Sequence, residues 1–237
     1  MAIKYKVKQI LDFGKKSRTG AIIMAEIATG AALALVSLWA FAQITDEVVE
    51  KETAAFDTAV QAAVYSLRSE SLTGIMTAIS FLGSKEFLFW VSLALIAFFC
   101  VKNKRRAAIT YAAILLLSAG LNNLIKLIIH RDRPQLLPLE ETTFFSFPSG
   151  HSMNSLVFYG LLAYFAYHYA KNKALGLSIY IIAVLITVLI GFSRIYLGAH
   201  YPTDVIAGFV AGMLILSAAI VIHKTLVLKK LFDGAKR

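Results

Sequence analysis

Six stretches of this chain consist almost entirely of apolar residues, and this feature constrains the fold more than any other. They cover residues 20–43, 85–101, 107–129, 150–170, 174–192 and 203–222. A helix needs about 20 such residues to cross a bilayer, where it satisfies its own backbone polar groups. With 58% hydrophobic and 16% charged residues, the composition lies outside the soluble range. The sequence therefore predicts an all-α, six-transmembrane helical bundle that forms a single integral membrane domain over residues 1–237.

The segment between the first two predicted spans, residues 50–83, does not fit a crossing. Residues 50–68 place charged side chains among many alanines, which is typical of an amphipathic surface helix. The apolar stretch 71–83 has only 13 residues, so it is interpreted as an interfacial or re-entrant helix. We therefore expect an additional interfacial amphipathic helical segment here, although its role is not indicated by the sequence.

The positive charge of the chain orients the bundle. The formal net charge is +10, but the basic residues cluster in the short gaps between apolar runs, which favours a membrane protein over one that binds nucleic acid. With six spans, most of the 24 lysines and arginines fall on the side of both termini, which we expect to be cytoplasmic. The loops 130–149 and 193–203 then share the opposite face. The oligomeric state is not indicated.

Polar residues of an unusual kind gather at the outer ends of three of these spans. They are Lys126 and Arg133 at the end of the third span, Ser149, Gly150 and His151 at the start of the fourth, and Arg194, His200 and Asp204 before and at the start of the sixth. Fixed positive charges, two histidines and a carboxylate thus lie on one side of the bundle. This combination predicts a site for a multiply charged anion.

The cations and the start of the fourth span favour phosphate as that anion. Arginine offers a planar fork that matches phosphate oxygens, and lysine adds a compact charge. Ser149 is a good N-cap residue, and the helix it begins points free N–H groups and the positive end of its dipole toward the site. Gly150 lets an anion approach the backbone closely.

The two histidines predict catalysis in addition to binding. His200 and Asp204 are four residues apart, and Pro202 between them suits the first helical turn. The carboxylate can accept from one imidazole nitrogen and leave the other as a nucleophile or a base. His151, on a different span, is available as a general acid. A phosphoryl group held between two histidines suggests displacement through a phosphohistidine intermediate.

The spacing of these residues resembles the three-part signature of the type-2 phosphatidic acid phosphatase superfamily. Its parts are Lys-x6-Arg-Pro, Pro-Ser-Gly-His and Ser-Arg-x5-His-x3-Asp, matched here by Lys126 to Arg133-Pro134, Pro148 to His151, and Ser193-Arg194 to Asp204. Every specified position matches, in order, within the core motif region 126–204. The combination is specific, although each part alone is a weak signal.

The resemblance implies a metal-independent hydrolase, without a cofactor, that acts on a phosphate ester or anhydride of a membrane lipid. The roles it implies are nucleophile for His200, orientation of that histidine for Asp204, proton donation for His151, and phosphoryl binding for Lys126, Arg133, Ser149, Gly150 and Arg194. The chain looks most like small bacterial members that act at the extracytoplasmic face of the cell membrane. A lipid phosphomonoester, phosphatidylglycerophosphate or phosphatidic acid, is the leading expectation, and undecaprenyl diphosphate is the alternative.

Other interpretations of these residues explain less. Lys126, Arg133 and Arg194 could simply flank spans, but the outer face is otherwise poor in positive charge. A serine hydrolase at Ser149 or Ser152 would lack the second glycine of a nucleophile elbow. No metal site is expected, because no histidine and acidic residue show HExxH-like spacing. An anion-binding transporter would use the cations but gain nothing from a His-Asp pair.

Three phenylalanines, at positions 144, 145 and 147, precede the fourth span. They fit an aromatic belt at the membrane interface and a hydrophobic gate for a lipid tail equally well. Both interpretations stay open at this point.

Overall fold

The computed structural model describes residues 18–135, 138–139, 144–169 and 172–234, and every regular element within these residues is an α-helix. The helices are α2 (Arg18–Val49), α3 (Ala54–Tyr65), α4 (Glu70–Phe81), α5 (Lys85–Val101), α6 (Arg105–Ile129), α7 (Gly150–Tyr169), α8 (Lys173–Tyr196) and α9 (Pro202–Gly234). The all-α prediction is confirmed. The basic N-terminal residues 1–17, which helped to orient the bundle, lie outside the described residues.

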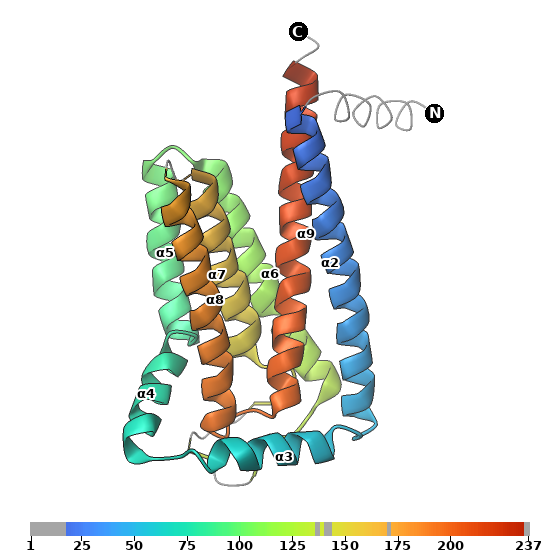
Figure 1. The fold of residues 1–237 in the computed structure, drawn as a ribbon, viewed down its shortest axis with the longest axis vertical. Coiled ribbons are helices and arrows are strands. Elements are labelled where there is room, and N and C mark those ends of the chain that lie inside the picture. Colours follow the sequence, from blue (N-terminus) through green and yellow to red (C-terminus); the bar gives the residue numbers. More distant parts are fainter. Residues whose placement is uncertain (1–17, 136–137, 140–143, 170–171, 235–237) are drawn as a thin grey trace.

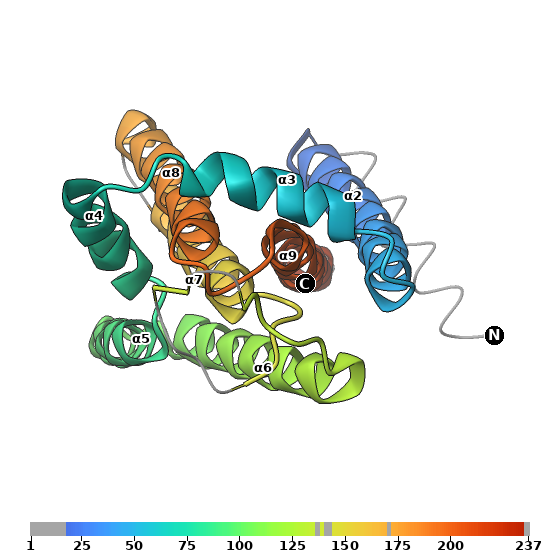
Figure 2. The ribbon, with the colours of Figure 1, turned by 90° about the horizontal axis from the view of Figure 1, so that it is seen from below.

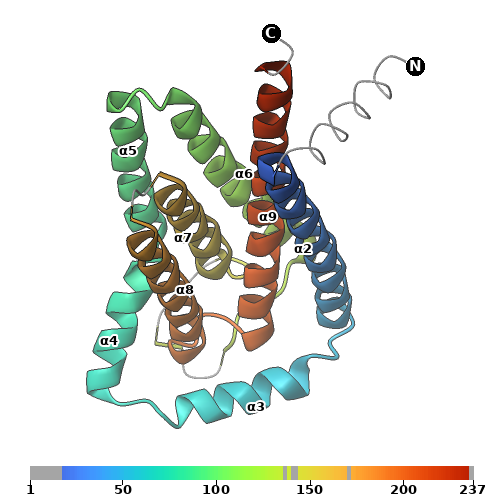
Figure 3. The ribbon, with the colours of Figure 1, turned by 45° about the horizontal axis from the view of Figure 1, so that its top comes forward.

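The long helices run side by side, and α3 lies across one end of them (Figures 1 and 3). Helix α7 is central, because it packs against α8 and α9 and also contacts α5 and α6. Helix α2 packs along α9, and the start of α2 and the end of α9 lie at the end of the bundle opposite α3. The Glu26 carboxylate and the Lys224 ammonium, 2.5 Å apart, join α2 to α9 near that end.

Four described helices are long and apolar enough to cross a membrane, namely α2, α6, α8 and α9. Helices α4 and α5 together make a fifth candidate, bent by 43° at the short break between them. Helix α7 is not in this set, so the predicted count of six spans stays a prediction. The same holds for the interfacial placement of residues 50–83, which here form α3, α4 and their connections.

Two helices extend well beyond the apolar runs from which they were predicted. Helix α2 continues to Val49 instead of ending near residue 43, and α9 continues to Gly234 instead of ending near residue 222. The added turns carry charged side chains but no proline, so nothing in the backbone stops the helix there. The apolar run thus marks the membrane-compatible part of a helix rather than its ends.

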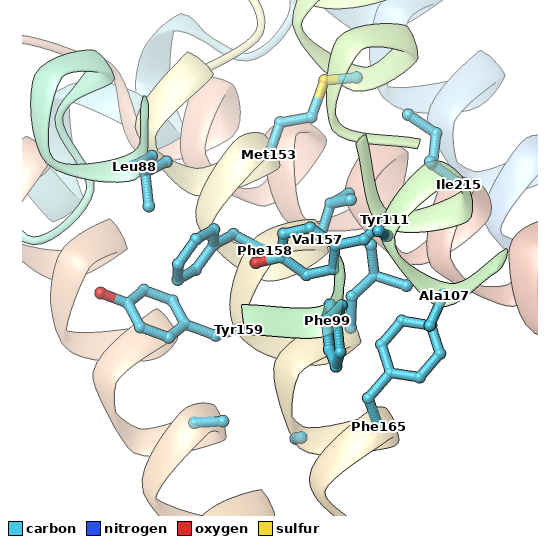
Figure 4. Packing of buried hydrophobic residues seen from close by; sticks show 14 of the residues in the cluster. Leu88, Phe99, Ala107, Tyr111, Met153, Val157, Phe158, Tyr159, Phe165 and Ile215 are labelled. Carbon is cyan, nitrogen blue, oxygen red and sulfur yellow. The ribbon is translucent and has the colours of Figure 1, made fainter. Parts of the chain in front are cut away.

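The apolar core lies around α7 and is rich in aromatic side chains (Figure 4). Tyr111 of α6 meets Phe158 of α7 edge to face with ring centroids 6.1 Å apart, and Phe99 of α5 meets Phe165 in the same way at 5.6 Å. Such pairs add about 1 kcal/mol each to the burial of their area. This core holds α5 and α6 against the helix that begins with the histidine motif.

Close packing of α9 on α7 depends on a glycine. A Cβ atom at Gly208 would lie 2.7 Å from the carbonyl oxygen of Ser149. Only a residue without a side chain lets the two helices approach this closely. In addition, the Ser149 N–H donates to the Asp204 carbonyl at 2.9 Å, so the starts of α7 and α9 are joined directly.

Helices α3 and α4 both pack against α8 (Figure 2). Arg68, between α3 and α4, donates to the Tyr196 carbonyl from two nitrogens, at 2.9 and 2.7 Å. The Tyr196 hydroxyl in turn accepts from the backbone N–H of Ser69 at 3.0 Å. These bonds therefore join the segment 50–83 to the last residue of α8, just before the loop that carries His200.

Candidate active site

A cavity of about 700 Å³ opens near the end of the bundle that α3 covers. Six of the eight predicted site residues line it, and they are Lys126, Arg133, Gly150, His151, Arg194 and His200. The other two, Ser149 and Asp204, lie fully buried directly behind this lining. The structure thus brings the three sequence motifs to one place, with both imidazoles facing the same cavity. The catalytic role of each residue stays a prediction.

Asp204 lies at the start of α9, next to the His200 ring. Its Oδ2 is 3.4 Å from His200 Nδ1, which is ion-pair distance and longer than a good hydrogen bond, and Nδ1 has no hydrogen-bond partner within the described part of the chain. The same Oδ2 accepts from the backbone N–H of Tyr201 at 2.9 Å, which fixes the carboxylate. The expected pairing between His200 and Asp204 is present, but it is looser than the spacing alone suggested.

His200 Nε2 faces the cavity, where it lies 3.3 Å from an Arg133 guanidinium nitrogen. Arginine has no lone pair, so in this contact Nε2 is the acceptor and the imidazole proton resides on Nδ1, toward Asp204. Burial, together with the charges of Arg133, Lys126 and Arg194, holds the pKa of the His200 imidazole well below its ordinary value. The ring is therefore neutral at pH 7, and the electron pair of Nε2 lies on the cavity side, where it accepts from Arg133.

Backbone carbonyls hold two of the motif cations in place. Lys126 of α6 donates to the carbonyls of Phe145 and Ser146, the latter at 3.2 Å. Arg133 donates to the Ala199 carbonyl at 2.6 Å and also to the Phe144 carbonyl. These bonds join the end of α6 to the loops before α7 and α9.

The third cation, Arg194, is placed by a segment outside the motifs. It lies near the end of α8, is almost completely buried, and donates to the Ser80 hydroxyl of α4 at 2.5 Å. Nothing in the sequence pattern pointed to Ser80. Three cations placed in advance around one cavity can stabilise charge that develops on a phosphoryl group.

The start of α7 has the cap expected from its sequence. Ser149 Oγ accepts from the backbone N–H of Ser152 at 3.3 Å, and this places His151 one residue into the helix. Gly150 lines the cavity, but it also has a packing role, because a Cβ there would lie 2.9 Å from Asn122 Oδ1. The Asn122 amide donates to the Pro148 carbonyl at 3.3 Å and so supports this turn from α6.

The phenylalanines before α7 have separate positions. Phe144 lines the cavity, as a gate for a lipid tail requires. Phe147 is fully buried and stacks on Phe41 of α2 with centroids 6.0 Å apart. Phe145 packs against the His130 ring at 4.5 Å. Of the three, only Phe144 is placed to contact a molecule in the cavity.

Comparison with known proteins decides the family. The family model of the PAP2 superfamily matches residues 107–228, a region that contains all three motifs. The chain belongs to the PAP2 superfamily. This confirms the resemblance drawn from the motifs.

Relatives of this PAP2 protein extend the match beyond the motif region. Phosphatidylglycerophosphatase B of Bacillus subtilis is 37% identical over 163 residues, which cover 67% of this chain and 79% of that protein. An undecaprenyl-diphosphatase of Sulfolobus acidocaldarius is 28% identical over 167 residues, which cover 68% and 75%. The crystal structure of a transmembrane PAP2-type phosphatidylglycerolphosphate phosphatase from Bacillus subtilis has a TM-score of 0.74 at 30% identity and covers 86% of this chain and 98% of that one. The chain is therefore a lipid phosphatase and an integral protein of a bacterial membrane.

The PAP2 site includes a charged pair that the sequence analysis missed. Arg131 donates to Asp204 Oδ1 at 2.7 Å and, with its other terminal nitrogen, to Asp57 Oδ2 at 2.7 Å. Asp57 also accepts from the backbone N–H of Thr203 at 2.9 Å and from its hydroxyl at 2.8 Å. Helix α3 thus supplies a buried carboxylate that caps α9 and holds, through Arg131, the carboxylate behind His200.

We expect Arg131→Gln to destabilise the protein by about 3 kcal/mol, because Asp57 and Asp204 would stay buried without their shared cation. Thermal unfolding in one fixed detergent measures this. Arg131→Lys keeps the charge but cannot reach both carboxylates with a planar fork, so an intermediate loss is expected. Lys51→Gln removes a charge from an exposed position and serves as the matched control. An Arg131→Gln protein as stable as wild type would contradict the assigned role.

Proposed function

We propose that this protein hydrolyses a phosphomonoester of a membrane lipid through a phosphohistidine intermediate, without a metal ion. His200 Nε2 attacks phosphorus, and the bond from phosphorus to the lipid oxygen breaks. His151 donates a proton to the departing oxygen. His151 then takes a proton from water, which cleaves the phosphorus–nitrogen bond, releases phosphate and restores neutral His200. Lys126, Arg133 and Arg194 balance the charge of the phosphoryl group throughout.

One observation carries this proposal. Two imidazoles from different segments, His151 of α7 and His200 of the α8–α9 loop, line one cavity together with the three cations of the motifs. A nucleophile and a proton donor on separate segments can stand on opposite sides of a phosphorus atom, as an in-line displacement needs. The burial and neutral state of His200 support it as the nucleophile.

The rest of the cavity supports a lipid as the substrate. Away from the cations its lining is mostly apolar and comes largely from α5 and α6, with Leu88, Leu93, Ile96, Leu115 and Leu116 among the residues. A lipid tail can lie along this surface while its headgroup phosphate reaches the histidines. We propose phosphatidylglycerophosphate or phosphatidic acid as the substrate, in line with the phosphatidylglycerophosphatase relative, and undecaprenyl diphosphate as the alternative, in line with the other relative.

We also propose that the six predicted spans cross the cell membrane, with both termini cytoplasmic and the cavity at the extracytoplasmic face. The start of α2 and the end of α9 lie at the end of the bundle opposite α3, which supports this orientation (Figure 1). The distribution of lysine and arginine along the chain supports it as well.

Phosphate release from lipids in detergent micelles tests the proposed function. We expect the purified protein to release phosphate from phosphatidylglycerophosphate, phosphatidic acid or undecaprenyl diphosphate in the presence of EDTA. We expect vanadate, which resembles the five-coordinate transition state, to inhibit this release. Binding of these lipids without release would favour an anion-binding transporter, and a rate abolished by EDTA would contradict the metal-free mechanism.

A further inference from the structure

A fourth cation faces the same cavity and belongs to none of the three motifs. Lys85 is the first residue of α5, is exposed, and lines the cavity together with Lys126, Arg133 and Arg194. Within the described part of the chain, its ammonium has no hydrogen-bond or ion-pair partner. Lys85 is thus available to bind an anion inside the cavity.

The positive charge of the described cavity lining exceeds what a single phosphate balances. The four cations line it without any carboxylate among the described lining residues. A phosphomonoester carries about two negative charges near pH 7. The three motif cations therefore suffice for the scissile phosphate, and Lys85 leaves a surplus that a further anionic group of the same ligand can neutralise.

The position of Lys85 on α5 places its positive charge between the expected positions of the lipid headgroup and the lipid tail. Lys85, Leu88, Ser92 and Ile96 recur at helical spacing, so they share the face of α5 that lines the cavity. Lys85 begins this face close to His151, because a Cβ at the nearby Gly83 would lie 3.2 Å from His151 Cδ2, and Leu88 and Ile96 follow it along the helix. A cation in the first turn of a helix is disfavoured by the helix dipole, so helix stability does not account for it.

We propose that Lys85 binds a second phosphate of the substrate, the one that lies between the scissile phosphoryl group and the lipid tail. The site then selects lipids that carry two phosphates over lipids that carry one. Both phosphatidylglycerophosphate and undecaprenyl diphosphate have such a second phosphate, whereas phosphatidic acid does not. This inference rests on the proposed function, and it names the chemical feature of the substrate that the enzyme recognises.

The test compares three lipids in identical micelles: phosphatidylglycerophosphate, undecaprenyl diphosphate and phosphatidic acid. We expect Lys85→Ala to lower kcat/KM about 10-fold for the two-phosphate lipids, the effect of losing one charge-assisted contact, and much less for phosphatidic acid. Lys85→Gln guards against a folding defect in the alanine variant. Lys85→Arg should retain most of the preference, and Lys51→Ala, which removes an exposed charge away from the cavity lining, should behave as wild type.

The outcomes separate this inference from the proposed function. A loss of kcat/KM confined to one of the two-phosphate lipids supports the second-phosphate site and shows which headgroup this site binds. An equal loss on all three lipids, or no loss on any, overturns the site while the phosphatase activity stands. If the wild-type protein releases phosphate from none of the three lipids, the proposed function fails, and the inference that rests on it fails with it.

Discussion

Replacing His200 with alanine is expected to abolish turnover, with a fall in kcat of at least about 10⁴-fold, because the proposed nucleophile is lost. Nε2 of this residue is directed into the cavity, and burial beside three cations keeps the ring neutral. Phosphate release measures the loss. Rapid quench of the wild-type reaction with ³²P-labelled lipid in alkaline detergent should in addition trap a phosphoprotein that is stable in base, loses its label in acid, and is not formed by the variant.

The matched control is His130→Ala. His130 follows α6 and is exposed, and its ring packs on Phe145 outside the cavity lining. We expect this variant to release phosphate at close to the wild-type rate. If His200→Ala keeps activity within about tenfold of wild type, or still forms the labelled intermediate, the nucleophile has been assigned wrongly.

Replacing His151 with alanine is expected to slow hydrolysis of a lipid phosphomonoester by about 10²–10⁴-fold, the usual contribution of general acid–base catalysis. The loss should depend on the leaving group. p-Nitrophenolate is stable as an anion near neutral pH, so its departure from p-nitrophenyl phosphate needs no proton from the enzyme. The first step should therefore stay fast in the variant with this substrate.

The second step supplies an independent signature in the same variant. Because His151 in the proposed mechanism also activates the water that cleaves the phosphohistidine, turnover of p-nitrophenyl phosphate should stop after a burst. We expect about one equivalent of nitrophenol per active site, followed by a slow phase. Stopped-flow absorbance measures this directly. An equal loss on both substrates with no burst would instead assign His151 to phosphate binding.

The sequence predicted those parts of the site that follow local rules. His200 and Asp204 are an i, i+4 pair around the start of a helix, and Ser149 has the side chain of an N-cap, so their geometry follows from spacing. The apolar runs predicted the helices for the same reason, although α2 and α9 continue past them. Local pattern and observed structure agree where only a few neighbouring residues decide the outcome.

The residues that were missed are positioned by contacts between distant segments. Asp57 looked like an ordinary charge on a surface helix, yet it is buried against Arg131, 74 positions further along the chain. Ser80 reaches Arg194 across 114 positions. The sequence around a serine or aspartate on an amphipathic helix does not indicate such a distant partner. Only the packing of α3 and α4 under the bundle reveals it.

Because α3 and α4 cover one end of the bundle and contact its site, we expect the region matched by the family model to be insufficient for catalysis by itself. Residues 107–228 contain all three motifs but none of Asp57, Ser80 and Lys85. A fragment or chimera built on that region alone would have the proposed nucleophile and the proposed phosphate-binding arginines. It would lack Asp57 and Ser80, which contact Arg131 and Arg194. Engineering of this enzyme should therefore exchange the preceding helices together with the motif region as a unit.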